Sequence, residues 1–225
     1  MKRSEINKLM KEAVAFFNEM NFKLPPFAFW TPSEWATKGH EYDEIRDNML
    51  GWDLTDFGLG DFHSKGLLLF TLRNGNFHDR QKYAKPYAEK IMIVEEGQVT
   101  PYHFHWSKME DIINRGGGDL IVKVYNSTED GKFADTDVDV YMDGRHFTVE
   151  VGTELRIKPG ESISIQQGMY HSFWADGGKA LVGEVSMVND DTSDNRFYEE
   201  TGRFPAIDED EEPLYLLGNE YPIAK

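Results

Sequence analysis

Residues 97–117 read GQVTPYHFHWSKMEDIINRGG, a stretch that combines closely spaced histidines with a carboxylate and has glycines at both ends. His103 and His105 are separated by one residue. In a β-strand, residues i and i+2 point to the same face, so both imidazoles can reach one point. Glu110 follows within five residues and adds a carboxylate, and Gly97 and Gly117 bracket the group.

A second stretch supplies a further candidate ligand, His171. From Gly160 to His171 the chain reads GESISIQQGMYH. The spacing of the two stretches resembles that of the two cupin motifs, in which three histidines and one glutamate bind a metal ion. The second stretch departs from its motif at Gln166, where the motif has proline, and at Ala175, where it often has asparagine. Neither departure removes the ligand His171.

His103, His105, Glu110 and His171 are therefore the predicted ligands of one divalent metal ion. Three imidazoles and one carboxylate suit a mid-series divalent metal, and four protein ligands leave two positions of an octahedral ion open for substrate or water. The other histidines have no partner at such a spacing, and we expect them to be structural or exposed. They are His40, His63, His78 and His146.

Outside these stretches, the pattern changes along the chain from helical to extended. Apolar residues recur at helical spacing over residues 4–20, with Ser4 as the expected N-cap. Thr31-Pro32-Ser33-Glu34 is typical of a capped helix start, and a third helical stretch is expected over residues 41–50. From about residue 66, short apolar runs alternate with glycine and proline turns about every 8–12 residues, which predicts a sandwich or barrel. The predicted strands are 66–73, 91–95, 119–125, 138–142, 146–151, 155–158, 162–166, 171–175 and 181–187.

The predicted fold class is all-β. We expect a cupin barrel (a double-stranded β-helix, or jelly roll) with an N-terminal helical extension. The chain is expected to form a single domain over residues 1–225. Residues 1–60 would be the mainly helical extension, residues 66–190 the barrel, and residues 191–225 a tail that packs on the barrel.

The composition excludes several classes of function. The formal net charge of the 225-residue chain is −16, which argues against nucleic-acid or membrane-surface binding, because phosphates need clustered lysine and arginine. No apolar run is long enough to span a membrane, and no apolar signal region follows Met1. The chain has no cysteine, which excludes disulfides and thiolate chemistry and agrees with the predicted cytoplasmic location.

Polar residues near the predicted ligands are the candidates for catalysis. Glu184 lies within the apolar run Leu181–Met187, where a carboxylate is costly unless it is paired or functional, so it is the leading candidate for a catalytic base. Lys108, between His105 and Glu110, is predicted to be catalytic, because a cation there would stabilise an oxyanion or move a proton. Lys90 interrupts another apolar run and is predicted to bind substrate.

The polar run 189–197 follows the Glu184 strand, and we expect a loop that can line the barrel mouth. Asp190 within it, and Arg203 further on, are predicted substrate contacts.

Taken together, the sequence resembles the D-lyxose isomerase family of cupins over nearly its full length. The resemblance rests on residues 103–111 (HFHWSKMED), 167–174 (QGMYHSFW) and 184–191 (EVSMVNDD). It implies interconversion of D-lyxose with D-xylulose and of D-mannose with D-fructose. It also implies Mn²⁺ as the preferred metal, with Co²⁺, Fe²⁺ or Zn²⁺ as other possible ions, a monosaccharide as substrate, and a homodimer.

The chemistry of an aldose–ketose isomerase suits these residues. A metal ion that holds both sugar oxygens would acidify the hydrogen at C2, and Glu184 could move that proton to C1 through a cis-enediol. A metal-assisted hydride shift needs no base and is compatible with the same residues.

Two other functions share the metal motif. A cupin oxygenase would use the same ligands with iron and oxygen, but polar residues are predicted around this site, namely Lys90, Lys108, Glu184 and Asp190. A non-catalytic sugar-binding cupin would not need a positioned base.

Overall fold

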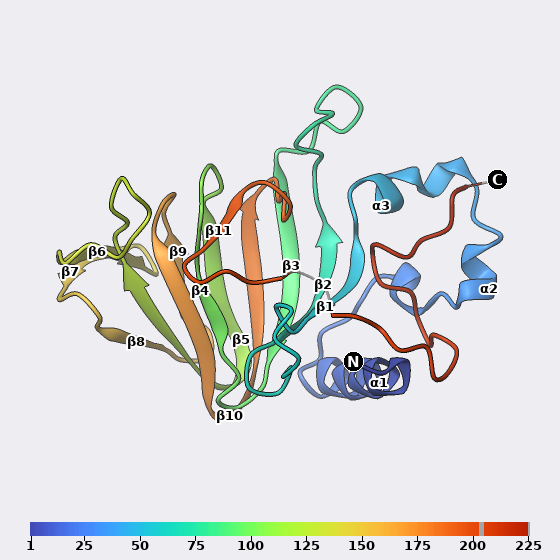
Figure 1. Ribbon diagram of the computed structural model, residues 1–225, viewed down its shortest axis with the longest axis horizontal. Helices are drawn as coiled ribbons and strands as arrows, with labels where there is room; N and C mark the ends of the chain where they lie inside the picture. The colour runs from blue at the N-terminus through green and yellow to red at the C-terminus, as the bar shows by residue number, and fades with distance from the viewer. Residues whose placement is uncertain (203–204, 225) are drawn as a thin grey trace.

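The computed structural model describes residues 1–202 and 205–224 and consists of a small helical part beside a large antiparallel β structure (Figure 1). The helices gather at one end of the molecule, next to β1, while β6 and β7 lie at the other end (Figure 1). The helical elements are α1 (Arg3–Glu19), η1 (Pro26–Phe29), α2 (Pro32–Trp35), η2 (His40–Tyr42) and α3 (Asp43–Asp47). The strands are β1 (Gly51–Thr55), β2 (Leu67–Arg73), β3 (Tyr87–Val94), β4 (Thr100–His105), β5 (Glu110–Tyr125), β6 (Val138–Met142), β7 (Arg145–Val149), β8 (Glu154–Ile157), β9 (Ser162–Ile165), β10 (Tyr170–Met187) and β11 (Asn195–Phe197).

Two long strands, β5 and β10, pair with each other and join the two halves of the barrel. The first half has the strand order β1-β2-β3-β10-β5-β9-β6-β7. In the second half, β4 pairs with β10 and β11, and β8 pairs with β5. The β5–β10 pairing shifts register between Asp176 and Ala180, where Gly177 and Gly178 have φ of 77° and 118°. Such values favour glycine, so these residues allow the strand to bend from one sheet to the other.

Strand alternation decides which side chains enter the barrel. Glu184 and Lys90 are direct partners across β10 and β3, so their side chains lie on the same face. Their neighbours two residues away, Val182 and Met92, belong to the buried cluster inside the barrel. Ile91 lies on the opposite face, in a second cluster with the apolar side of α1. Because the period is two, Glu184 and Lys90 enter the same interior as Val182 and Met92.

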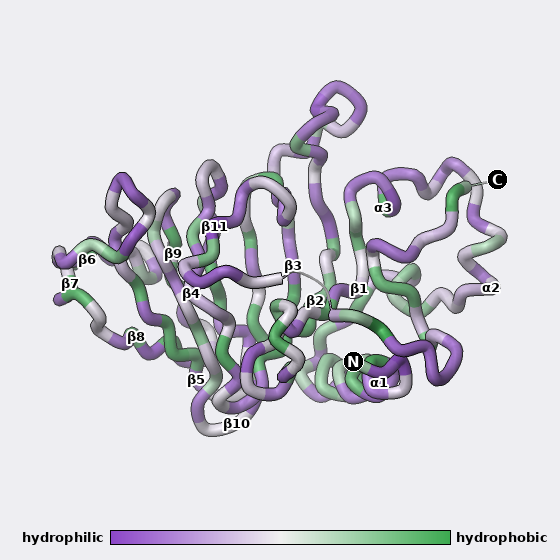
Figure 2. Tube along the Cα trace, in the orientation of Figure 1, coloured by the Kyte–Doolittle hydropathy of each residue, from purple (hydrophilic) through white to green (hydrophobic). Residues whose placement is uncertain are grey.

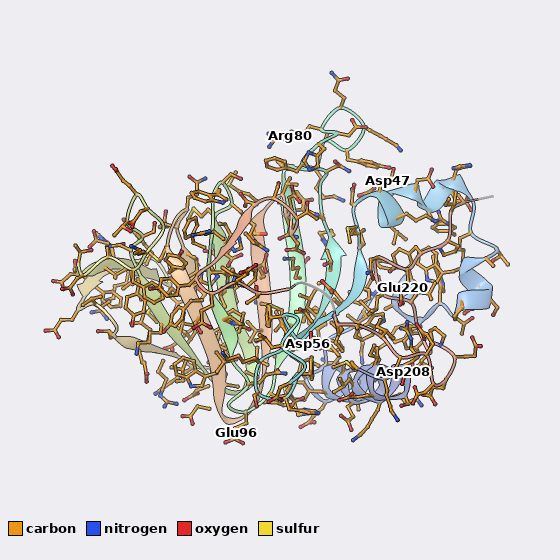
Figure 3. The ribbon with its side chains drawn as sticks, in the orientation of Figure 1. Asp47, Asp56, Arg80, Glu96, Asp208 and Glu220 are labelled. Atoms are coloured by element: carbon orange, nitrogen blue, oxygen red, sulfur yellow. The ribbon has the colours of Figure 1, made fainter. Side chains whose placement is uncertain are left out.

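The C-terminal segment returns to the first helix. Asp208 pairs with Lys2 in a short parallel bridge, and Leu217 does the same with Trp52 of β1. Arg3 is buried, and its guanidinium donates to Glu209 and to Glu220. Figure 3 labels Asp208 beside α1 and Glu220 further along the C-terminal segment. The hydrogen bond to Glu209, opposed by burial and reinforced by Glu220, raises the pKa of Arg3.

The predicted all-β cupin-type barrel with N-terminal helices is confirmed. The capping box predicted at Thr31 and Glu34 is present, with reciprocal hydrogen bonds between side chain and backbone. Ser4 does not cap α1, whose N-cap is Lys2; the Ser4 hydroxyl donates to Asp210 instead. The division into segments 1–60, 66–190 and 191–225 of one domain stays a prediction.

Several elements differ from expectation. Residues 195–197, expected within a loop, form β11, which pairs with β4. The helical stretch expected over residues 41–50 ends at Asp47 and is followed by β1, which pairs with β2 and which the sequence pattern did not predict. The runs expected as separate strands at 171–175 and 181–187 form one strand, because its glycines bend the strand without ending it.

The loop between β2 and β3 projects beyond the body of the molecule and is hydrophilic along most of its length (Figure 2). Within residues 1–202 and 205–224, no helix combines the length and apolar composition needed to cross a membrane.

Replacement of Arg3 by alanine tests the link between α1 and the C-terminal segment. Arg3→Ala should lower the free energy of unfolding by about 1.5–3 kcal/mol, because charge-assisted hydrogen bonds to two carboxylates are lost. Lys8→Ala is the control, since the Lys8–Glu12 pair is exposed on the same helix and should contribute at most about 0.5 kcal/mol. Denaturant unfolding of both variants measures the difference, and equal stability of the two would contradict a stabilising role for Arg3.

Candidate active site

The four predicted metal ligands come together between the two halves of the barrel. His103 and His105 lie on β4, and His171 on β10 is the direct cross-strand partner of His103. One ring nitrogen from each histidine lies within 4.8 Å of the other two, in a group that could hold a metal ion. Glu110 begins β5, and its Oε1 and Oε2 lie 3.1 Å from His171 Nε2 and 3.2 Å from His105 Nε2.

Hydrogen bonds at the outer ring nitrogens orient the three imidazoles. Nδ1 of His103 lies 2.8 Å from the carbonyl oxygen of Pro101, and Nδ1 of His171 lies 3.1 Å from that of Met169. Nδ1 of His105 lies 2.8 Å from Oδ1 of Asn195. Because each partner is an acceptor, Nδ1 carries the proton in all three rings and Nε2 presents its lone pair.

The inner atoms of the cluster fit a bound cation. His105 Nε2 and His171 Nε2 are buried without a hydrogen-bond partner. Both face the carboxylate of Glu110, whose Oε2 is also contacted by Lys108 Nζ at 2.7 Å. The nitrogen lone pairs therefore face a carboxylate, an arrangement that repels unless a positive ion lies among them. Burial lowers the pKa of His103 and, together with nearby Lys108, that of His105, which keeps both rings neutral and able to bind a metal.

A second buried group of charges adjoins the ligands. Nζ of Lys108 lies 2.7 Å from Glu110 Oε2 and 2.9 Å from Glu184 Oε1, and Nζ of Lys90 lies 3.4 Å from the same Glu184 oxygen. Asn189 Oδ1 accepts from both lysines, at 2.8 Å from Lys90 and 3.1 Å from Lys108. All four charged side chains are at least nine-tenths buried, so each depends on its partners for neutralisation.

The pKa shifts of this group follow from its pairing. Burial opposes the charge on Lys108, but Glu110 and Glu184 outweigh it and raise the pKa of Lys108 above its ordinary value. Burial likewise opposes the charge on Glu110, but Lys108 and His105 outweigh it and hold the pKa of Glu110 well below its usual range. At neutral pH the site therefore contains the charged ammonium group of Lys108 beside the charged carboxylate of Glu110.

Both groups face one cavity inside the barrel. Predicted site residues that line it include Lys90, His103, His105, Lys108, Glu110 and Glu184. Its wall is otherwise largely apolar or aromatic, which suits a site that holds a small molecule away from bulk water. These wall residues include Phe57, Leu67, Leu69, Met92, Ile112, Phe173 and Phe197.

Sequence reasoning missed several residues of the site, all in the segment after β10. Asp191, Asn195 and Phe197 line the cavity, and Asn189 bonds both lysines. Two features of the sequence could have indicated these residues. The polar run directly follows the Glu184 strand, and Asn195 and Phe197 have the i, i+2 spacing of residues on one face of a strand. These two residues lie on β11, beside His105 and His103 of β4.

Asp190 is not brought into this cavity. Its carboxylate accepts hydrogen bonds from Thr192 and Ser193 and pairs with His78 at 3.1 Å, and it lines a second cavity on the other side of the 189–192 segment. Its oxygens are thus engaged in shaping the loop. Arg203, the other predicted substrate contact in this region, lies outside the described residues.

Backbone and side-chain contacts hold the two motif stretches against each other. The amide of Gly168 donates to the carbonyl of His105 at 2.9 Å, and the Gln167 side chain donates to the carbonyl of Ser107. The carboxylate of Asp194 accepts from the backbone amides of Ser107 and Lys108. These bonds fix the turn between His105 and Glu110, and with it the position of Lys108.

Comparison with known proteins agrees with this site. The sequence matches the D-lyxose isomerase family model over residues 1–221. It is 49% identical over 224 residues to a D-lyxose/D-mannose isomerase from Escherichia coli O157:H7, and 51% identical over 225 residues to one from Serratia proteamaculans, with 98% of each chain covered in both cases. Among solved structures, an L-ribose isomerase from Cellulomonas parahominis superposes with a TM-score of 0.59 at 14% identity, over 92% of this chain and 98% of that chain.

The antiparallel barrel, with its buried histidine cluster, has the cupin fold. The chain belongs to the D-lyxose isomerase family and is a sugar isomerase. This assignment sets aside the oxygenase and the non-catalytic binding protein considered above.

Proposed function

We propose that this isomerase is metal-dependent and interconverts D-lyxose with D-xylulose and D-mannose with D-fructose. The choice of sugars is supported by the two close relatives named D-lyxose/D-mannose isomerase. The observation that carries the metal dependence is the pair of buried Nε2 atoms, of His105 and His171, that have no hydrogen-bond partner and face the carboxylate of Glu110.

His103, His105, Glu110 and His171 are the proposed ligands, and Mn²⁺ is the proposed ion, with Co²⁺, Fe²⁺ or Zn²⁺ as other candidates. Imidazole and carboxylate ligands suit these metals. When bound, the ion would polarise the sugar oxygens at C1 and C2 and so acidify the hydrogen on C2.

Glu184 is the proposed base. It lies in the cavity beside the ligand cluster, and its charge is stabilised by Lys90 and Lys108. In the direction from aldose to ketose, its carboxylate would take the proton from C2 and return it to C1, through a cis-enediol.

Lys108 is proposed to move the second proton. Its ammonium group would give a proton to O1 and recover one from the C2 hydroxyl group. In total, one hydrogen passes from C2 to C1 and one from O2 to O1. Because its pKa is raised, Lys108 begins the reaction protonated. Lys90 is proposed to hold a substrate oxygen, while Asp190 and Arg203 stay predicted substrate contacts.

A hydride shift from C2 to C1 is the second candidate mechanism. It would need the polarised oxygens but no base, and the largely apolar wall of the cavity is compatible with it. We also propose that the protein forms a homodimer in the cytoplasm. We expect it to bind neither nucleic acid nor membranes.

The proposed function predicts metal-dependent turnover. Protein freed of metal with a chelator should be inactive on D-lyxose and D-mannose, and added Mn²⁺ should restore formation of D-xylulose and D-fructose. Parallel additions of Co²⁺, Fe²⁺ and Zn²⁺ rank the candidate ions. Unchanged turnover in protein shown by elemental analysis to be metal-free would contradict metal dependence, and activity confined to other aldoses would contradict the substrates.

Replacement of His171 tests the ligand set. His171→Ala should lose stoichiometric metal, because one of four ligands is removed from a buried site. His146→Ala is the control, since His146 is exposed on β7, far along the sheet from the cluster. Elemental analysis after dialysis gives the metal content, and full metal occupancy in His171→Ala would refute its role as a ligand.

Replacement of Glu184 tests the base. Glu184→Gln keeps the shape of the side chain but removes the basic carboxylate, so metal should stay bound while kcat falls about 10²–10⁴-fold. Glu89→Gln is the matched control, because Glu89 lies on β3 opposite Val185, on the outer face of the same strand pair. Near-normal turnover in Glu184→Gln, without incorporation of solvent deuterium into the product, would instead favour the hydride shift.

A further inference from the structure

Asn74 binds the backbone of Asn189 through both ends of its side-chain amide. The backbone amide of Asn189 donates to Asn74 Oδ1 at 3.0 Å, and Asn74 Nδ2 donates to the backbone carbonyl of Asn189 at 3.0 Å. The Asn74 side chain thus takes the place of a peptide unit in an antiparallel pair, one residue beyond the end of β2.

We call these two hydrogen bonds between Asn74 and the backbone of Asn189 the clamp. The side chain of Asn189 extends from the clamp to the two buried lysines. A single oxygen, Asn189 Oδ1, accepts from Lys90 and from Lys108, and both ammonium groups also contact the same oxygen of Glu184. The position of Asn189 therefore sets where the two positive charges lie relative to Glu184.

Asn74 is itself held firmly. It is 6% exposed, and its carbonyl accepts from the side chain of Asn48, the residue after α3, at 3.1 Å. At Gly75, an added Cβ would meet the carbonyl oxygen of Lys85 and lie 2.8 Å from Val188 Cγ2, so this turn packs closely on the residue before Asn189. Asp47, at the end of α3, is labelled near this base of the β2–β3 loop in Figure 3.

We propose that Asn74 is a positioning residue for the isomerase reaction, which acts through Asn189 to align Lys90 and Lys108 with Glu184. The inference rests on the proposed function, because it assigns a catalytic purpose to these lysines. Asn74 lines the second cavity, together with Asn189, and is absent from the wall of the cavity that contains the metal ligands. Its effect on turnover therefore passes through Asn189 and not through contact with the sugar at the metal centre.

Two substitutions of Asn74 distinguish its effect on the alignment of the two lysines from its effect on local packing. Asn74→Ala removes both hydrogen bonds. Asn74→Asp keeps the shape and the acceptor but places a carboxylate oxygen against the carbonyl of Asn189. Both should lower kcat about 10- to 100-fold with bound metal retained, because a small displacement of catalytic groups has effects of this size. Asn76→Ala, in the same loop, removes carboxamide hydrogen bonds that do not reach Asn189 and should change kcat by no more than about twofold.

A double-mutant cycle tests the route through Asn189. If Asn74 acts through Asn189, the variant with both Asn74→Ala and Asn189→Ala should have about the same kcat as Asn189→Ala alone. Losses that multiply, or wild-type kcat in Asn74→Asp, would overturn the proposal. Thermal unfolding and metal content identify any variant that simply fails to fold, and the Asn74→Asp result then stands on its own, since its side chain is isosteric.

Failure of this inference can be told apart from failure of the proposed function. If Glu184→Gln and Lys108→Met retain normal turnover, the assigned mechanism is wrong whatever Asn74 does. A crystal structure of metal-loaded Asn74→Asp then tests the positioning directly. Displacement of Asn189 Oδ1 from the two lysines is expected, and unchanged distances would refute the clamp.

Discussion

Burial of ionised side chains between the two halves of the barrel is the constraint on which the site depends. Lys108 and Glu110 are each 2% exposed, and a charge so far from water must be neutralised by partners at hydrogen-bonding distance. Lys108 meets this demand by lying between Glu110 and Glu184. The three imidazoles beside them turn their outer nitrogens to hydrogen-bond acceptors. His105 and His171 turn their inner nitrogens to Glu110, which is the carboxylate of the proposed ligand set.

The two halves of the barrel contribute different parts of this arrangement. β4 and the first part of β10 carry the histidines, while β3 and the last part of β10 carry Lys90 and Glu184. β10 belongs to both halves, so one strand, bent at Gly177 and Gly178, supplies His171 to the histidine cluster and Glu184 to the wall of the adjoining cavity. A shift of one residue in either pairing would turn these side chains out of the barrel.

The segment after β10 completes the site and connects it to the rest of the molecule. Asn195 fixes the ring of His105, Asp194 fixes the turn that carries Lys108, and Asn189 binds both lysines. Through Asn74, the same segment is joined to the base of the β2–β3 loop. Contacts outside the barrel wall thereby help to set the geometry inside it.

The sequence by itself determined the barrel with its helical extension, the histidine cluster and the candidate charges, because these follow from local periods. Spacing of two residues put His103 and His105 on one face, and a carboxylate in an apolar strand marked Glu184 as paired or functional. Only the tertiary structure decided which groups complete the site. Asn195, Asn189 and Asn74 act across 90, 81 and 115 residues of chain, on His105, Lys108 and Asn189 respectively, distances over which sequence spacing carries no information. The same holds for Asp190 and Asp191, adjacent residues of which only Asp191 lines the barrel cavity, because the loop's own hydrogen bonds set their orientation.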